Sequence, residues 1–211
     1  MARRRKPQIS VRKQPKQARS TELVSIILEA AIHVLAKEGA ARFTTARVAE
    51  KAGVSVGSLY QYFPNKAAIL FRLQSDEWRQ TTELLRSILE DGSKPPPERL
   101  RTLVHAFVRS ECDEAEMRTA LSDAEPLYRD APEARKAKEA VTWSFQAFMR
   151  EAVPQATDAN RALAEELITT TLSAVGKQFS ETPRNPGEIT AFADAMADMF
   201  CAYLDGLGRV R

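Results

Sequence analysis

The sequence predicts an all-α protein, and three observations support this fold class. Apolar residues recur at spacings of three and four along most of the chain, which is the period of a helix with one buried face. No segment alternates apolar and polar residues as a half-buried strand does, and no internal repeat is present. The 211 residues are 44% hydrophobic and include only 8 glycines, so the chain can bury a sizeable core.

Residues 1–19 are predicted to form a disordered basic arm in front of the first helix. They hold eight Lys and Arg residues, two prolines and no acid, and almost no apolar residue. A segment of this composition cannot bury enough apolar surface to fold. Two interpretations stay open: the arm contacts the phosphates or the minor groove of DNA, or it is a solvated tail.

The first helix is predicted to begin near Thr21 and to end at Gly39. Its apolar residues form one stripe: Leu23, Ile26, Ile27, Ala30, Val34 and Leu35. Gly39 follows this stripe, and glycine adopts the left-handed conformation that ends a helix at low cost.

Residues 44–63 are predicted to form two short helices joined by a sharp turn. Thr44 or Thr45 can cap the first helix, because a threonine hydroxyl accepts a hydrogen bond from a free amide of the first turn. Gly53 lies where the chain has to turn. The inward face of the helix and the corner after it are small and apolar: Val48, Ala49, Ala52 and Val54.

The second helix of this pair is predicted to present polar and aromatic side chains outward. Ser55 caps it, while Leu59 and Phe63 point into the core. Its eight or so residues span roughly 12 Å, which fits the width of the major groove of DNA. Its outward residues are Val56, Gly57, Ser58, Tyr60, Gln61 and Tyr62. Glutamine can pair with adenine, and tyrosine and serine can reach phosphates or a thymine methyl.

The charges of the chain are distributed unevenly. Up to Gln74 there are 14 Lys and Arg and 4 Asp and Glu, a net of +10, whereas the remainder has 17 and 24, a net of −7. A basic amino-terminal third predicts a polyanionic partner for that part of the chain. Lys66, at the start of the following helix, would place a cation and a helix terminus beside the DNA backbone.

Further helices are predicted in the rest of the chain. They cover about residues 66–90, 97–114, 115–130 (a short helix and a loop), 131–152, 159–181, and 186 to Gly206 or Gly208. The prolines at 95–97 interrupt helical structure before the helix predicted at 97–114. Asp130 and Asp158 are expected caps, and Pro186 suits a first helical position.

The segment TTARVAEKAGVSVGSLYQYFPNKAAIL resembles the DNA-binding domain of the TetR/AcrR family of bacterial transcriptional regulators. The resemblance covers about residues 20–70. It implies a basic arm at 1–19, a helix-turn-helix DNA-binding domain at 20–66, and a helical domain for effector binding and dimerisation at 67–211.

The resemblance also implies roles for single residues. Thr45, Ser58, Tyr62 and Lys66 would hold phosphates, and Val56, Gly57 and Tyr60 would face bases. Ala46 stands where some members have an arginine that touches DNA, so Arg47 is its expected substitute. The candidate DNA-binding residues are Thr44, Thr45, Arg47, Ser55, Val56, Gly57, Ser58, Tyr60, Gln61, Tyr62 and Lys66.

In this family the rest of the chain dimerises and holds a small ligand, so residues 67–211 are expected to do both. Candidate ligand-binding residues are Phe107, Glu111, Cys112, Trp143, Phe148 and Thr170. Candidate dimer residues are Leu167, Leu172, Val175, Phe179, Phe192, Met196, Met199, Phe200 and Tyr203. Two helices from each subunit would form a four-helix interface. For each residue of both sets the alternative is ordinary packing in the subunit's own core.

These observations predict a ligand-responsive transcriptional regulator that binds double-stranded DNA as a homodimer. The preferred mode is a repressor that a small-molecule effector releases from a palindromic operator. The alternatives are a transcriptional activator and a non-specific DNA-binding protein that uses the basic arm. An enzyme is not expected, because no nucleophile–base spacing and no glycine-rich phosphate loop is present.

No cofactor or metal is expected either. The 2 Cys and 2 His residues are isolated in the sequence, without the spacing of metal ligands. The cysteines are interpreted as packing residues, with redox sensing as the alternative. No apolar run approaches the roughly 18 residues of a membrane span, and the basic start lacks the apolar core of a secretory signal. A cytoplasmic protein without a membrane partner is therefore expected.

Overall fold

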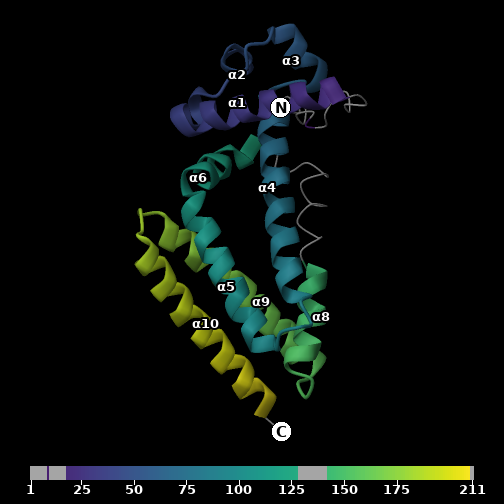
Figure 1. Ribbon diagram of the computed structural model, residues 1–211, viewed down its shortest axis with the longest axis vertical. Helices are drawn as coiled ribbons and strands as arrows, with labels where there is room; N and C mark the ends of the chain where they lie inside the picture. The colour runs from purple at the N-terminus through teal and green to yellow at the C-terminus, as the bar shows by residue number, and fades with distance from the viewer. Residues whose placement is uncertain (1–8, 10–17, 128–141, 210–211) are drawn as a thin grey trace, which may run out of the picture. The chain divides into compact units, whose positions relative to one another are not determined.

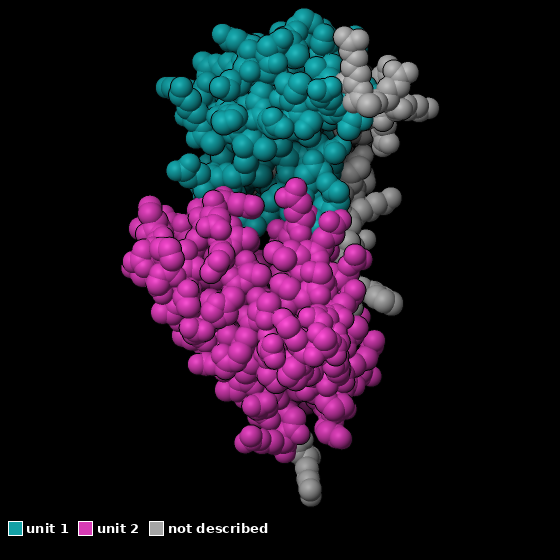
Figure 2. All heavy atoms as spheres, viewed as in Figure 1, with its two compact units in different colours: residues 1–79, 116–138 teal, residues 80–115, 139–211 magenta. Residues whose placement is uncertain are grey.

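The computed structural model describes residue 9, residues 18–127 and residues 142–209. Every regular element within these ranges is a helix (Figure 1), as the sequence predicts. The elements are α1 (Ala18–Arg42), α2 (Thr45–Lys51), α3 (Val56–Tyr62), α4 (Lys66–Leu89), α5 (Pro96–Asp113), α6 (Ala115–Ala124), the 3₁₀ turn η1 (Glu125–Leu127), α8 (Thr142–Ala152), α9 (Asp158–Ser180) and α10 (Pro186–Arg209). Packing divides the chain into two compact units, shown in Figure 2: residues 1–79 with 116–138, and residues 80–115 with 139–211.

Most helix boundaries follow local signals in the sequence. α1 is broken at Gly39, where the helix is expected to end, and the φ of 71° is a positive value that glycine tolerates. Helical structure resumes after this kink and continues to Arg42, three residues beyond the expected end. α10 begins at Pro186, again as predicted. In front of it, the Asn185 side chain accepts a hydrogen bond from the Glu188 amide at 3.0 Å, and the Glu188 carboxylate accepts one from the Asn185 amide at 2.9 Å. This reciprocal pair satisfies two amides that the first turn leaves without a helical partner.

The predicted cap of α9 is wrong by one residue. Thr157 caps this helix, because its hydroxyl accepts a hydrogen bond from the Asn160 amide at 3.2 Å. Asp158 is the first helical residue and forms an ion pair with Arg161 at 2.8 Å. A carboxylate in the first turn is favourable because the amino-terminal end of a helix carries partial positive charge. The helix predicted at 131–152 is observed from Thr142 as α8, and its earlier part lies outside the described residues.

The first unit is built around one apolar cluster. Helices α1 to α4 and the link between α1 and α2 contribute to it, and its least exposed large side chains are Ile27, Leu35, Phe43, Leu59, Phe63, Ile69 and Leu70. Burying a side chain of this size contributes about 1.5–3 kcal/mol relative to leaving it in water. Because α2 and α3 have only 7 residues each, this burial stabilises them far more than their own backbone bonds do.

Ile9 also belongs to this cluster and is only 3% exposed. The sequence places it in the predicted disordered arm, of which residues 1–8 and 10–17 lie outside the described residues. Ile9 and Val11 are isolated among basic and polar residues and form no helical or strand period, so the burial of Ile9 was not predictable from the pattern.

Helix α6 packs in the first unit, although more than forty residues separate it from α3 in the sequence. Its residues Ala120, Leu121 and Ala124 are buried in the same apolar cluster. Arg118 forms a half-buried ion pair with Glu77 of α4 at 2.9 Å. The packing units therefore differ from the predicted domains at 20–66 and 67–211, and those domains remain a prediction about function.

The second unit has its own core, formed by the end of α4 and by α5, α8, α9 and α10. Its most buried side chains include Leu100, Leu103, Val104, Val108, Phe145, Met149, Ile168 and Ala197. α5 packs against both α9 and α10. Gly176 of α9 allows a close approach, because a Cβ at this position would lie only 3.0 Å from the Phe107 ring of α5.

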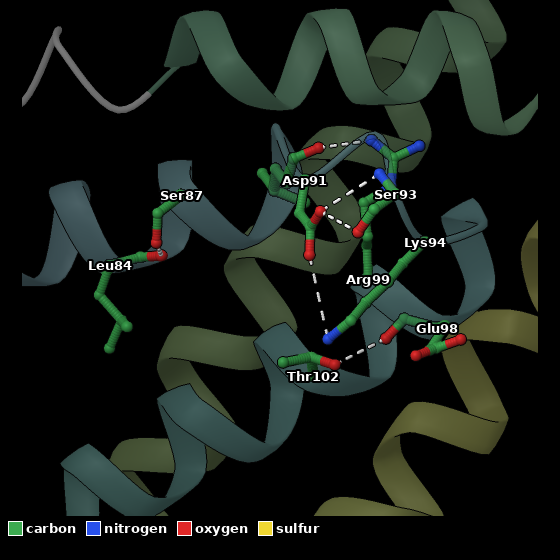
Figure 3. Close-up of polar contacts among 9 residues, drawn as sticks. Leu84, Ser87, Asp91, Ser93, Lys94, Glu98, Arg99 and Thr102 are labelled. Carbon is green, nitrogen blue, oxygen red and sulfur yellow. Dashed lines mark hydrogen bonds and ion pairs between the residues drawn. The ribbon is translucent and has the colours of Figure 1, made fainter.

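Polar contacts organise the connection between α4 and α5 (Figure 3). The Asp91 carboxylate accepts hydrogen bonds from the hydroxyl and the amide of Ser93, and these bonds lower the pKa of Asp91. Arg99 is 2% exposed and donates to the carbonyl of Leu89, the last residue of α4, at 2.6 Å. It also pairs with Glu151 of α8. Arg99 thus joins the ends of three helices in the second unit.

We predict that Gly53→Ala lowers the free energy of unfolding by about 1–2 kcal/mol, because the left-handed conformation is strained for residues with a Cβ. Gly53 has a φ of 66°, and no atom lies within 4 Å of the added Cβ, so any loss comes from the backbone. Gly57→Ala is the matched control: its Cβ would lie 3.7 Å from the Ser55 hydroxyl, an ordinary contact, and we expect no loss. Urea unfolding measures both variants, and a Gly53→Ala protein as stable as the wild type would contradict the prediction.

Candidate DNA-binding surface

The helices α2 and α3 and the turn between them form a helix-turn-helix. Thr44 caps α2 by accepting a hydrogen bond from the Arg47 amide at 3.3 Å, and Ser55 caps α3 by accepting one from the Ser58 amide at 3.0 Å. Within the turn, the amides of Gly53 and Val54 donate to carbonyls of α2 at 3.1 Å and 3.0 Å. Both predicted caps and the predicted turn are confirmed. The backbone amides of the turn are satisfied, so the direction of α3 is set locally as well as by the core.

The core decides which side of α3 faces outward. Leu59 and Phe63 are fully buried, as predicted. Tyr62, a predicted phosphate contact, is only 5% exposed and belongs to the same cluster. The exposed residues of α3 are Val56, Gly57, Tyr60 and Gln61, all of them candidate DNA-binding residues.

Two predicted DNA-binding residues from different helices meet on this surface. The hydroxyl of Thr45, in the first turn of α2, lies 3.1 Å from the hydroxyl of Tyr60 on α3. Tyr60 is 39% exposed. The hydrogen bond links the outward faces of both helices and limits the orientation of the Tyr60 ring before any DNA is bound. A similar bond at 2.8 Å joins the hydroxyls of Ser55 and Ser58.

Lys66 occupies the start of α4, as expected, and is half-buried. Its amine donates to the carbonyl of Phe43 at 3.4 Å, so it ties α4 to the link between α1 and α2. The Asn65 side chain accepts a hydrogen bond from the Ala68 amide at 2.9 Å. One of the helix-terminal amides expected to attract a phosphate is therefore already satisfied within the protein.

Arg47 makes a contact that the sequence did not predict. Its guanidinium pairs with the carboxylate of Glu38, near the end of α1, and also donates to the carbonyl of Arg42 at 3.3 Å. The Arg47 side chain is 46% exposed and that of Glu38 is 28% exposed. Glu38 and Arg47 are nine positions apart and lie on different helices, so no helical spacing relates them.

The predicted ligand-binding residues all fall in the second unit, but in different environments. Phe107 and Glu111 are buried, and both side chains lie next to Gly176. Phe148 is also buried, 5.6 Å from the guanidinium of Arg99 and 6.3 Å from the ring of Phe145. Cys112 is half-buried, whereas Thr170 is exposed on α9. The side chain of Trp143 lies outside the described part of the structure.

The predicted dimer residues differ in how far they are exposed. Leu172, Met196 and Phe200 are buried in the core of their own chain, and Val175, Phe179, Phe192 and Tyr203 are half-buried. The rings of Phe179 and Phe192 stack on each other at 3.9 Å and join α9 to α10. Leu167 and Met199 are 48% and 51% exposed, and Leu163, on the same apolar stripe, is 60% exposed.

The two cysteines, Cys112 and Cys201, have thiols whose pKa is raised by burial. A raised pKa leaves less of the reactive thiolate. Within residues 18–127 and 142–209, no group of three or more His, Cys, Asp and Glu side chains is arranged to hold a metal ion. None of the described helices has the length and apolarity that a membrane span requires.

Comparison with solved structures shows that other proteins share this fold, among them the transcriptional regulator FadR. FadR from Bacillus subtilis, in complex with stearoyl-CoA, superposes with a TM-score of 0.68 at 18% identity, covering 84% of this chain and 97% of that one. SmeT in its complex with triclosan superposes with a TM-score of 0.63 at 18% identity, covering 86% and 91%.

Sequence comparison adds curated relatives and two family models. The nucleoid occlusion factor SlmA of Vibrio campbellii is 38% identical over 83 residues, which are 39% of this chain and 42% of the relative. The chain thus spans about two fifths of the length of the curated relatives it matches. Residues 27–73 match the model described as bacterial regulatory proteins, tetR family, and residues 95–207 match the Tetracyclin repressor-like, C-terminal domain. Because the second match alone covers more than half of the chain, this protein belongs to the TetR family of bacterial transcriptional regulators.

Proposed function

We propose that this regulator is a homodimeric repressor that binds a palindromic operator and leaves it when a small-molecule effector binds. The observation that carries the proposal is the outward face of α3. It combines an exposed backbone at Gly57 with exposed Tyr60 and Gln61 side chains, and the hydroxyl of Tyr60 is held by Thr45.

These groups suit the edges of base pairs in the major groove. Glutamine can make two hydrogen bonds to adenine, and the apolar surface of Val56 and the Tyr60 ring can meet a thymine methyl. Gly57 lets the backbone approach closely. The 7 residues of α3 are roughly 10 Å long, so the helix fits within one groove. We assign the phosphate contacts to Thr44, Ser58 and Lys66, and we infer that Tyr62 chiefly packs α3 against the core because it is only 5% exposed.

The homodimer would use the outward faces of α9 and α10. Leu163, Leu167 and Met199 are the large apolar side chains of these two helices that the chain itself leaves exposed. Apolar side chains exposed along one stripe are typical of an interface. In a two-fold dimer the same faces would meet, and two recognition helices would read the two halves of an inverted repeat.

The effector would bind in the second unit, where the buried residues are mainly apolar. FadR and SmeT are described with stearoyl-CoA and with triclosan, both of which have large apolar parts. By analogy we propose an apolar effector near Phe107 and Glu111 for this protein. Such a ligand shifts the regulator between two states only by its difference in affinity for them.

The proposal is tested by selecting bound duplexes from a random DNA library with the purified protein at about 0.15 M salt, where non-specific phosphate binding is weakened. We expect enrichment of an inverted repeat. Binding that survives disruption of α3 but is lost when residues 1–17 are deleted would favour a non-specific DNA-binding protein instead. An effector is then sought among apolar compounds by their release of the selected duplex.

We predict that Tyr60→Ala weakens binding to the selected operator by about 1–3 kcal/mol and relaxes its sequence preference, because a base-facing side chain is lost. Tyr60→Phe keeps the ring and removes only the hydroxyl that meets Thr45, so it should lose less. Thr45→Val removes the partner hydroxyl and should match Tyr60→Phe if the bond between them matters for orientation. Fluorescence anisotropy measures the affinities, and wild-type affinity in Tyr60→Ala would exclude α3 as the reader.

We predict that Leu167→Glu, which places a charge on the proposed interface, converts the dimer to a folded monomer. Its side chain is 48% exposed in the single chain, so the substitution should leave the monomer intact. Leu84→Glu is the matched control: Leu84 of α4 is 42% exposed and lies outside α9 and α10. Sedimentation velocity gives the oligomeric state. A Leu167→Glu protein that stays dimeric would require another interface.

A further inference from the structure

The backbone amide and the side chain of Arg47 both have partners within the protein, next to the surface proposed to bind DNA. Its backbone amide is bound by the Thr44 cap, and the next residue along from Thr44, Thr45, meets Tyr60 of α3. Arg47 therefore lies in the first turn of α2, close to two groups of the proposed DNA-binding surface. Its guanidinium, however, pairs with the Glu38 carboxylate and with the carbonyl of Arg42.

The Glu38 carboxylate occupies donors of the Arg47 guanidinium, which would otherwise be available to a phosphate. Both side chains are partly exposed, at 28% and 46%, so the pair is weak enough for a phosphate to compete with it.

Glu38 is one of only four acids in the first 74 residues, a part of the chain with a net charge of +10. Of the other three, Glu29 accepts a hydrogen bond from Ser25, one turn away on the same helix, at 3.4 Å. Glu38 thus differs from Glu29 in that its partner is Arg47, which the sequence predicts to be a DNA-binding residue. Glu29 serves as a reference for the effect of negative charge on α1 alone.

We propose that Glu38 sets the affinity of this regulator for DNA by competing with phosphates for Arg47. This inference rests on the proposed function, because it assumes that the face of α2 and α3 meets a duplex. The competition acts on the backbone contact and not on the bases. It lowers the affinity for every duplex by the same factor and leaves the preference for the operator unchanged.

The test is Glu38→Gln, which removes the charge and keeps the size of the side chain, with Glu38→Ala as a second variant that also removes the hydrogen bond. We expect about two- to tenfold tighter binding to the operator and to an unrelated duplex alike. The slope of log affinity against log salt should steepen by about one, as one more phosphate contact is gained. Thermal unfolding establishes that each variant is folded.

Two matched variants separate this proposal from simpler explanations. Glu29→Gln makes the same charge change on α1 and should leave affinity and salt slope nearly unchanged. In the double variant Glu38→Gln with Arg47→Ala, the gain should disappear, because the arginine that was released is gone. Arg47→Ala alone is the reference for the double variant, and in its background Glu38→Gln should bring no further gain.

The proposal is overturned if Glu38→Gln and Glu38→Ala bind DNA no more tightly than the wild type does. It is also overturned if Glu29→Gln gains as much DNA affinity as Glu38→Gln. A gain that persists in the double variant would also overturn it, because Arg47 would not be the group released. The proposed function is judged separately, by the ratio of operator to unrelated affinity: a ratio of one in all variants contradicts sequence reading, whatever Glu38 does.

Discussion

The surface that we propose to read DNA depends on the burial of Leu59 and Phe63 in the core of the first unit. A helix of 7 residues such as α3 is not stable in water by itself, because too few backbone bonds follow its nucleation. Its position and rotation are therefore imposed by Leu59 and Tyr62, which the helix buries, and by Phe63, which directly follows it. Since they set the inward face, they also determine that Val56, Gly57, Tyr60 and Gln61 are presented outward. A change in this core would move the proposed DNA-reading face of α3, even if the changed residue did not contact DNA.

The outward groups are in turn held by polar contacts with each other. Tyr60 is bound by Thr45, Ser58 by Ser55, and Arg47 by Glu38. Contacts of this kind restrict side chains before binding, which lowers the conformational entropy lost when a complex forms. The three contacts differ in what they leave available for binding DNA. The hydroxyl pairs keep capacity for further hydrogen bonds, whereas the ion pair engages an arginine and places a negative charge at the surface.

The second unit shows why an apolar stripe does not by itself identify an interface. The residues of α9 and α10 alternate between the core of their own chain and the surface, so one stripe includes Leu172, at 3% exposure, and Leu167, at 48%. The same holds for the candidate ligand residues, among which Phe107 packs against Gly176 while Thr170 faces outward. Only the arrangement of α5, α9 and α10 distinguishes these environments.

By itself, the sequence determined the helices, the caps at Thr44 and Ser55, the turn at Gly53 and the family resemblance. These features depend on hydrogen bonds and conformational preferences that span three or four residues, so their signals lie next to one another in the chain. Tertiary structure decided the rest: the burial of Tyr62 and Ile9, the packing of α6 with the first unit, and the pairing of Arg47 with Glu38. Each of these joins segments that are distant in sequence, and neither composition nor periodicity encodes which surfaces will meet. For that reason the helix-turn-helix was predictable from the sequence, whereas the burial and pairing of its individual side chains were not.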